Sequence, residues 1–185
     1  MSKLARIVAA STLAAVMVGT GLAGSAAASV SQPGDDAVVA SVDGSTYVLL
    51  GPGVFGVTVQ QDPLAYHAIE LADGTVNGQW RYDLWQAGQE TTFSGEVTCM
   101  TVSGNRAWVG GPITDSSDPT QIGMGAWWQI SDNGTGRHPV VPDRTTFVGI
   151  GTMAQTLAYC ANAPAPRFIF DVQLGGVQVA GPSSG

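Results

Sequence analysis

Charged side chains are scarce in this chain of 185 residues, where Asp, Glu, Lys and Arg together make up 11%. An average soluble domain carries about 25%. Basic residues are the scarcest, with seven Lys and Arg against 14 Asp and Glu, which gives a formal net charge of −7. Because an acidic surface repels phosphate backbones and anionic lipids, the sequence argues against nucleic acid or a membrane surface as the partner.

Histidine is nearly absent, and this limits the chemistry that the chain can perform. The two histidines are His67 and His138, and no Gly-x-Ser-x-Gly, Cys-x-x-Cys or His-x-x-x-His pattern occurs. His67 alternates with Ala65 and Ile69, which favours a hydrogen-bonded histidine in a strand over a general base. We therefore predict no catalytic residue, no metal site and no cofactor.

Two further motifs have a structural interpretation. Residues 51–56 match Gly-x-Gly-x-x-Gly, but a strand-like Val-Thr-Val-Gln follows them where a dinucleotide site needs a helix, so we expect a β-turn. Asp115, Asp118 and the pair Asp132–Asn133 complete no calcium loop and are interpreted as turn residues.

The N-terminal 28 residues have the three parts of a secretory signal. Lys3 and Arg6 form a basic start, an uncharged apolar run covers 7–22, and Ala26 and Ala28 form an Ala-x-Ala site. The run is marginal for a membrane span and is interrupted by Ser, Thr and Gly. We predict cleavage after Ala28 and a secreted, extracellular protein; a retained membrane anchor is the alternative.

The rest of the chain has an all-β pattern, without an apolar period of helical length. We expect a leader over 29–36, one β-domain over 37–180 and a tail over 181–185. Short alternating runs between Gly, Asn, Asp and Pro predict an antiparallel β-sandwich or barrel of about eight to eleven strands. The expected strands are 37–41, 45–50, 54–60, 64–71, 78–86, 95–103, 106–112, 122–131, 145–149, 154–160 and 167–180.

Period-two alternation also predicts which side chains face the core. The expected inward residues are Phe55, Val57, Val59, Trp80, Tyr82, Leu84, Ile122, Met124, Ala126, Trp128, Ile130, Phe168, Phe170, Val172 and Leu174. Loops are expected over 113–121 and 132–144, and Ser103-Gly104-Asn105 is expected to close a hairpin.

Cysteine occurs only twice, as Cys99 and Cys160. In an exported protein an even pair predicts a disulfide, with two buried free thiols as the alternative. Only one intramolecular pairing exists, and it closes a long loop.

Tryptophans provide the only residue-level suggestion of a ligand. Trp127 is expected to face away from the core, beside Gly123 and Gly125. Trp108 and Trp85 likewise share strand faces with charged residues. Exposed indoles above small residues form a platform that stacks on sugar rings or aromatic groups. The alternative is that a loop or an opposite sheet covers them.

Residues 94–111 read Ser-Gly-Glu-Val-Thr-Cys-Met-Thr-Val-Ser-Gly-Asn-Arg-Ala-Trp-Val-Gly-Gly, and Asp132-Asn-Gly, Pro142-Asp-Arg and Cys160 follow. Over about 78–180 this resembles a group of secreted β-domain proteins of high-GC bacteria. The resemblance implies a secreted β-domain and no known activity.

Two classes of function remain open from the sequence. The favoured one is a secreted, non-enzymatic binding module for an unknown extracellular ligand, such as carbohydrate or cell-wall material. The alternative is a small hydrolase using two spatially paired carboxylates, for which Glu70, Asp83, Glu90 and Glu96 are candidates without a spacing that selects a pair. The oligomeric state is not predicted.

Overall fold

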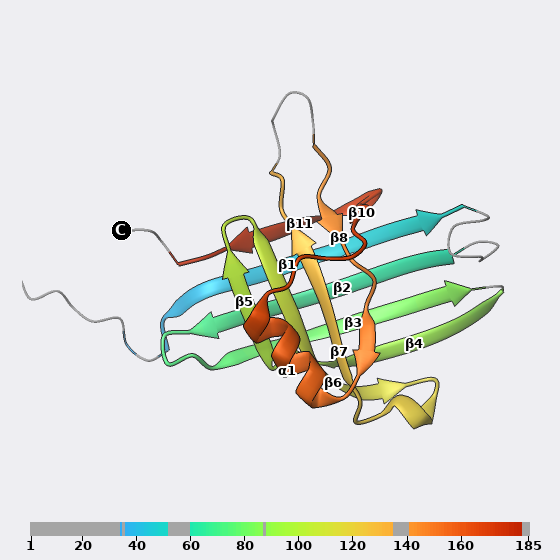
Figure 1. Ribbon diagram of the computed structural model, residues 1–185, viewed down its shortest axis with the longest axis horizontal. Helices are drawn as coiled ribbons and strands as arrows, with labels where there is room; N and C mark the ends of the chain where they lie inside the picture. Colours follow the sequence, from blue (N-terminus) through green and yellow to red (C-terminus); the bar gives the residue numbers. More distant parts are fainter. Residues whose placement is uncertain (1–33, 35, 52–59, 87, 135–140, 183–185) are drawn as a thin grey trace, which may run out of the picture. The chain divides into compact units, whose positions relative to one another are not determined.

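Antiparallel strands form one continuous sheet that curls back on itself, as the computed structural model shows (Figure 1). The structure describes residues 34, 36–51, 60–86, 88–134 and 141–182. Within these ranges the all-β prediction is confirmed, with eleven strands and one α-helix. The predicted signal segment, most of the strand expected at 54–60, and His138 lie outside the described residues.

The strands follow one another mostly as hairpins, and their path through the sheet is β10-β8-β7-β6-β4-β3-β2-β1-β11, with β5 also on β6 and β9 also on β7. Their bounds are β1 Val38–Leu50, β2 Gln60–Leu71, β3 Val76–Gln86, β4 Gln89–Glu96, β5 Cys99–Ser103, β6 Arg106–Ser116, β7 Gly125–Ser131, β8 Arg144–Thr145, β9 Gly149–Gly151, β10 Phe170–Asp171 and β11 Leu174–Ala180. A short 3-10 helix, η2, covers Pro119–Gln121.

The sheet folds into two layers because β6 belongs to both. Its first part pairs with β5 and β7, and its end pairs with β4. We call β11, β1, β2, β3 and β4 sheet A, and β5 to β10 sheet B. At the fold, Gly95 lies against Pro112 and Gly111 lies against Glu96 so closely that a Cβ on either glycine would strike the opposite backbone. Glycine therefore permits the close crossing of β4 and β6.

The core lies between the inner faces of the two sheets. Trp128 is fully buried there, and its ring centroid lies 5.6 Å from that of Trp80 and 5.9 Å from that of Tyr66. Trp80, Tyr82, Ala126, Trp128 and Ile130 are all buried, as alternation predicted. Leu84 and Met124 pack against this cluster.

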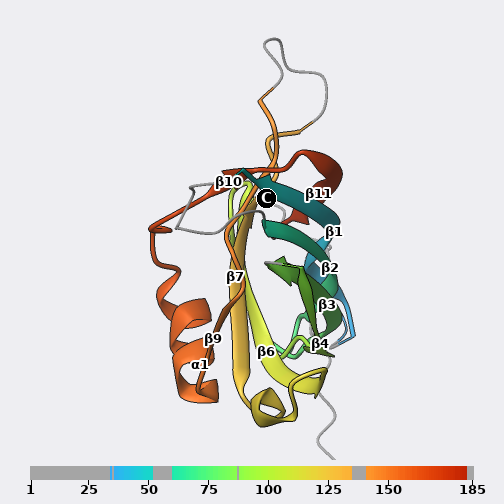
Figure 2. The same cartoon turned by 90° about the vertical axis from the view of Figure 1, so that its right-hand side faces the viewer.

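The strand expected at 154–160 is wrong, because this segment is helix α1, Met153–Asn162. A capping box starts it: the Thr152 hydroxyl accepts from the Gln155 N–H, and the Gln155 side chain accepts from the Thr152 N–H. The capping box gives hydrogen-bond acceptors to two backbone N–H groups at the start of the helix, and a strand has no need of this arrangement. The helix lies on the outer face of sheet B (Figure 2).

Other sequence predictions also fail locally. The strand expected over 167–180 is two strands, and Phe168 and Leu174 are 48% and 67% exposed because both lie at or beyond strand ends. Ile122 is exposed because it follows η2 instead of lying in β7. The loop expected at 113–121 is partly strand, since β6 continues to Ser116. The strand expected at 95–103 is divided between β4 and β5, because the chain passes there from sheet A to sheet B.

Two carboxylates connect the free edge of β11 to sheet B. Asp143 accepts from the Val177 N–H at 2.9 Å, and Asp132 accepts from the Val179 N–H at 3.1 Å. Residues two apart direct their N–H groups to the same edge of a strand. The two side chains therefore take the place of a neighbouring strand along this edge, which limits its availability for pairing.

Candidate functional site

The outer face of sheet A is the broad surface that no described helix or sheet covers. Figure 2 shows α1 on the far side of sheet B, so that the layers run helix, sheet B, sheet A. We call this surface the open face. It carries the odd-numbered residues of β1, β2 and β3 and the even-numbered residues of β4.

Strand register aligns the side chains of the open face in rows. One row consists of Gln178, Asp43, His67, Gln79 and Glu96, on β11, β1, β2, β3 and β4 in turn. His67 Nδ1 lies 2.9 Å from Asp43 Oδ2, and both side chains are more than half exposed. The row therefore presents hydrogen-bonding groups from every strand of sheet A.

The next row is built from small residues around one arginine: Gly176, Ser45, Ala65, Arg81 and Ser94. The Arg81 guanidinium binds Asp83 on the same strand, with an Nη2–Oδ1 distance of 2.9 Å. Hydrogen bonding to Asp83, followed by its charge, raises the pKa of Arg81 above its ordinary value. Because its neighbours in the row, Ala65 and Ser94, have short side chains, the Arg81 side chain projects beyond them from the surface of the sheet.

The parts of these rows on β2, β3 and β4, together with Ser45 of β1, line three adjoining shallow hollows of about 530, 420 and 340 Å³. The first two share His67 and Gln79, and the last two share Ala65 and Arg81. We call the three together the trough. Along β3 it extends from residue 77 to residue 83, which corresponds to about 20 Å of strand.

The trough ends in an apolar region that contains one of the predicted site residues. Trp85 is 43% exposed on β3, two residues beyond Asp83 on the same face. Leu174 lies opposite Tyr47 in the register of β11 and β1, and Leu49 follows Tyr47 on the same face. Trp85 is therefore an accessible indole on β3, two residues beyond the end of the trough.

The other two predicted tryptophans lie under the α1 region, on the opposite side of the molecule. Trp108 is buried, and its Nε1 donates to the Pro164 carbonyl at 2.8 Å. Trp127 is half-buried and lies 6.0 Å from the Tyr159 ring. Trp108 is thus covered, which is the second of the two alternatives, and the structure does not bring the three indoles together.

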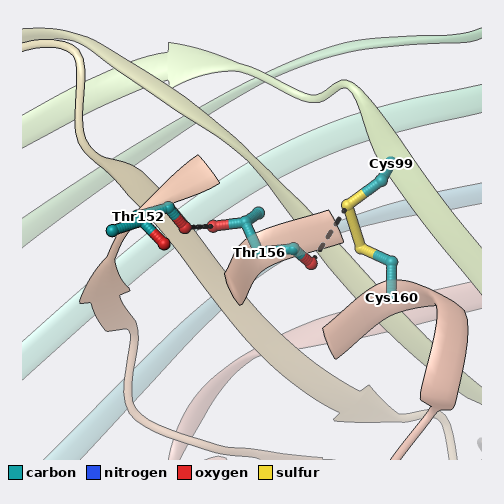
Figure 3. Close-up of a disulfide and its surroundings, with 4 residues drawn as sticks. All are labelled: Cys99, Thr152, Thr156 and Cys160. Atoms are coloured by element: carbon teal, nitrogen blue, oxygen red, sulfur yellow. Dashed lines mark hydrogen bonds between the residues drawn. A yellow bond between two sulfur atoms is a disulfide. The ribbon is translucent and has the colours of Figure 1, made fainter. Parts of the chain in front are cut away.

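A disulfide between Cys99 and Cys160 fixes this cover, as the sequence predicted (Figure 3). It joins β5 to α1 across 61 positions. The Cys99 sulfur also lies 3.7 Å from the Thr156 carbonyl oxygen, a packing contact because a disulfide sulfur carries no hydrogen. Thr156 is fully buried, and its hydroxyl donates to the Thr152 carbonyl at 3.3 Å.

Three of the four candidate carboxylates share one face of sheet A, and the fold separates the fourth from them. Asp83, Glu90 and Glu96 are on the open face, and Asp83 is bound to Arg81. Glu70 is on the opposite face of β2. Asp118 caps η2, and its hydrogen bonds to Thr120 lower its pKa, as expected for a turn residue. Among the described residues, no group of three or more His, Cys, Asp or Glu is arranged to hold a metal ion.

Comparison with protein-family models, curated proteins and solved structures found no match. In the described ranges, no helix is both long and apolar enough to cross a membrane.

Sequence reasoning missed the rows of the open face. The signal for the individual strands was present, since polar side chains alternate along β1 and β3. What was missing was the register that aligns Asp43 with His67 and Gln79, which follows from hairpin geometry.

Proposed function

We propose that this protein is an exported, non-enzymatic binding module that holds an uncharged glycan chain along the trough. The observation that carries the proposal is the exposed Trp85 indole, two residues beyond a trough whose lining includes the planar polar side chains of His67, Gln79 and Arg81. Aromatic rings pack against sugar rings, and carboxamide, carboxylate and guanidinium groups match the paired hydroxyls of a sugar.

The charge of the open face supports an uncharged ligand. Asp43, Asp83, Glu90 and Glu96 face outward there, with Arg81 as the arginine in the trough. An anionic polymer such as a polyphosphate meets repulsion from these carboxylates. A neutral polysaccharide meets no such repulsion and still finds hydrogen-bond donors and acceptors along the trough, which is about 20 Å long.

The shape of the site also supports binding over catalysis. Asp83 is engaged with Arg81, and its diagonal neighbour Glu90 projects from the same open face and not from an opposing wall. Hydrolysis of a glycosidic bond requires two carboxyl groups on opposite sides of the bond. An open sheet face with paired charges fits reversible attachment better than bond cleavage.

The experiment is a pull-down of the purified protein on chitin and on cellulose beads, followed by titration with the matching soluble oligosaccharides. Trp85→Ala and Gln79→Ala should each weaken binding about tenfold, the effect of losing roughly 1.4 kcal/mol. Leu157→Ala is the matched control, because Leu157 is an exposed apolar residue on α1. All three variants should keep the wild-type melting temperature.

Failure to bind either polymer, or equal loss in the Leu157 control, would contradict the proposal. Release of reducing sugars that disappears in Asp83→Asn would instead support the hydrolase alternative.

A further inference from the structure

A second, separate pocket lies on the outer face of sheet B, at the end of the sheet where β6 begins and β7 ends. Its volume is about 210 Å³. Arg106, Ser131 and Arg144 line it, and register places Ser131 directly between the two arginines on β6, β7 and β8. Three adjacent strands bring the arginine Cα atoms to about 10 Å of each other.

The two arginines carry an unusual concentration of positive charge for this chain. Only five basic residues follow residue 28, all of them arginine, and two of these line one small pocket. Arg144 donates from Nε to Asp171 at 2.8 Å, which fixes the guanidinium. None of the ion pairs among the described residues involves Arg106. Arg106, Arg144 and Asp171 together carry one positive unit, and the neighbouring carboxylates of Asp132 and Asp143 are bound to backbone amides of β11.

Gln129 supplies an independent sign that the pocket has a ligand. It is only 1% exposed, it lines the pocket, and its Oε1 has no hydrogen-bond partner among the described residues. An unpartnered buried polar group is costly and uncommon in a folded protein. Since a carboxamide rotates to present its NH₂ group in place of its oxygen, Gln129 is able to donate into the pocket.

The remaining lining residues define what fits. Val141, Pro166 and Ile169 give the pocket an apolar wall opposite its polar floor. A carboxylate matches the planar fork of an arginine with two parallel hydrogen bonds, and one negative charge matches the net charge of the arginines and Asp171. A phosphate dianion carries a second negative charge, which the Asp171 carboxylate repels.

We propose that this pocket binds a single carboxylate group attached to a small apolar substituent. Arg106 and Gln129 donate to the carboxylate, Arg144 is held in place by Asp171, and the apolar wall contacts the substituent. A free small acid and the C-terminal end of a peptide share this chemistry. The proposal is independent of the glycan site, because the residues that line the pocket are on the outer face of sheet B and those that line the trough are on the outer face of sheet A.

The test uses the full exported protein labelled for NMR and titrated with N-acetyl-alanine. The amide signals of Asn105, Gln129 and Ser131 should shift, and the methyl amide of the same compound, which lacks the carboxylate, should cause no shift. Inorganic phosphate should bind at least tenfold more weakly. Acetyl-trialanine binding more tightly than N-acetyl-alanine identifies a peptide end as the ligand, and equal or weaker binding identifies a free acid.

Substitutions then assign the site. Arg106→Gln should weaken N-acetyl-alanine binding at least tenfold without changing the melting temperature, because Arg106 is exposed. Arg167→Gln is the control: this arginine lies over the Phe168 ring and does not line the pocket. The wild-type shifts remain decisive if a variant does not fold. Absence of shifts at these residues, or equal binding of the methyl amide, overturns the proposal.

Discussion

Trp127 and Trp128 are consecutive in β7 but lie on opposite faces of sheet B. Trp128 is fully buried between the two sheets, whereas Trp127 lies outside, against the Tyr159 ring and above Gly149 and Gly151 of β9. Sheet B is therefore packed on both faces, by sheet A on one side and by α1 and β9 on the other.

The first prediction follows from this difference. Trp128→Ala should lower the free energy of unfolding by about 3–5 kcal/mol, because it leaves a large cavity in a close-packed core. Trp127→Ala should cost about 1–2 kcal/mol, because its ring is half-buried and has lost only part of its contact with water. Urea denaturation of the two variants measures both values. Equal costs would show that the α1 side of the sheet is packed as tightly as the core.

The second prediction concerns the disulfide between Cys99 and Cys160. Because it closes a loop of 61 positions, chain entropy gives a contribution of up to about 4 kcal/mol to stability. Reduction should lower the melting temperature by several degrees or more. At denaturant concentrations that only partly unfold the protein, the reduced form should show a larger change in tryptophan fluorescence than the oxidised form, since Trp108 and Trp127 both lie under α1. Intact mass before and after reduction and alkylation checks the bond itself. Two thiols that alkylate in the native protein would contradict it.

The third prediction concerns the seating of α1 on sheet B. Thr156 lies between Gly110 and Gly125, where a Cβ would strike its side chain. Gly125→Ala should therefore destabilise the protein by about 1–3 kcal/mol through overpacking. Gly176→Ala is the control, because a Cβ there meets open space, and it should be neutral or slightly stabilising. Similar melting temperatures for the two variants would show that the helix moves aside easily.

The sequence allowed prediction of features that depend on local alternation or on a unique pairing. Trp80, Tyr82 and Trp128 face the core because a strand has period two, and two cysteines allow one bridge. Helix α1 was missed although Thr152 and Gln155 have capping-box spacing, because periodicity alone does not distinguish a strand from a helix in a short, mostly apolar segment. The capping-box spacing therefore indicated the start of a helix, but the surrounding all-β pattern led to the prediction of a strand.

The candidate sites depend on pairing between distant segments, which alternation does not specify. The pocket on sheet B requires Arg106 and Arg144, 38 positions apart, to flank Ser131, and this depends on where β8 meets β7. Trp108 and Trp127 face outward as alternation predicts, but their exposure depends on α1 and the segment after it. Facing out of a sheet does not make a residue accessible when a third layer is present.

The fourth prediction is a loss of stability in alkali. Burial raises the pKa of Tyr159 from 10.0 to about 12, and burial raises the pKa values of Tyr66 and Tyr82 still further. Each phenol is thus held neutral in the fold but ionises near pH 10 when unfolded. The associated stability is complete below pH 10 and decreases as the pH rises beyond it.

Urea denaturation between pH 8 and about 12 measures this slope, and the chain has no lysine after Lys3 to titrate in the same range. Tyr159→Phe should make the slope shallower, because it removes one of the three groups. A slope unchanged in that variant would show that Tyr159 does not contribute.

The last prediction concerns Asp143, which uses both carboxylate oxygens on backbone amides. Oδ1 accepts from the Asn133 N–H at 2.8 Å, and Oδ2 accepts from the Val177 N–H at 2.9 Å. Asparagine has one acceptor oxygen, so Asp143→Asn must turn an NH₂ group toward one of these N–H donors. We expect a loss of about 1–3 kcal/mol in the free energy of unfolding, the cost of an unsatisfied, partly buried donor. Asp115→Asn is the matched control, because Asp115 is an exposed carboxylate on β6.

Hydrogen exchange locates the effect: the Val177 and Val179 amides should exchange faster in Asp143→Asn, while amides in the β2–β3 hairpin keep their protection. Because β11 is a sheet edge held on one side only by β1, loss of this contact should release β11 before the rest of sheet A. Uniform acceleration across all strands would instead mean that Asp143 stabilises the whole fold and has no particular role at the edge of β11.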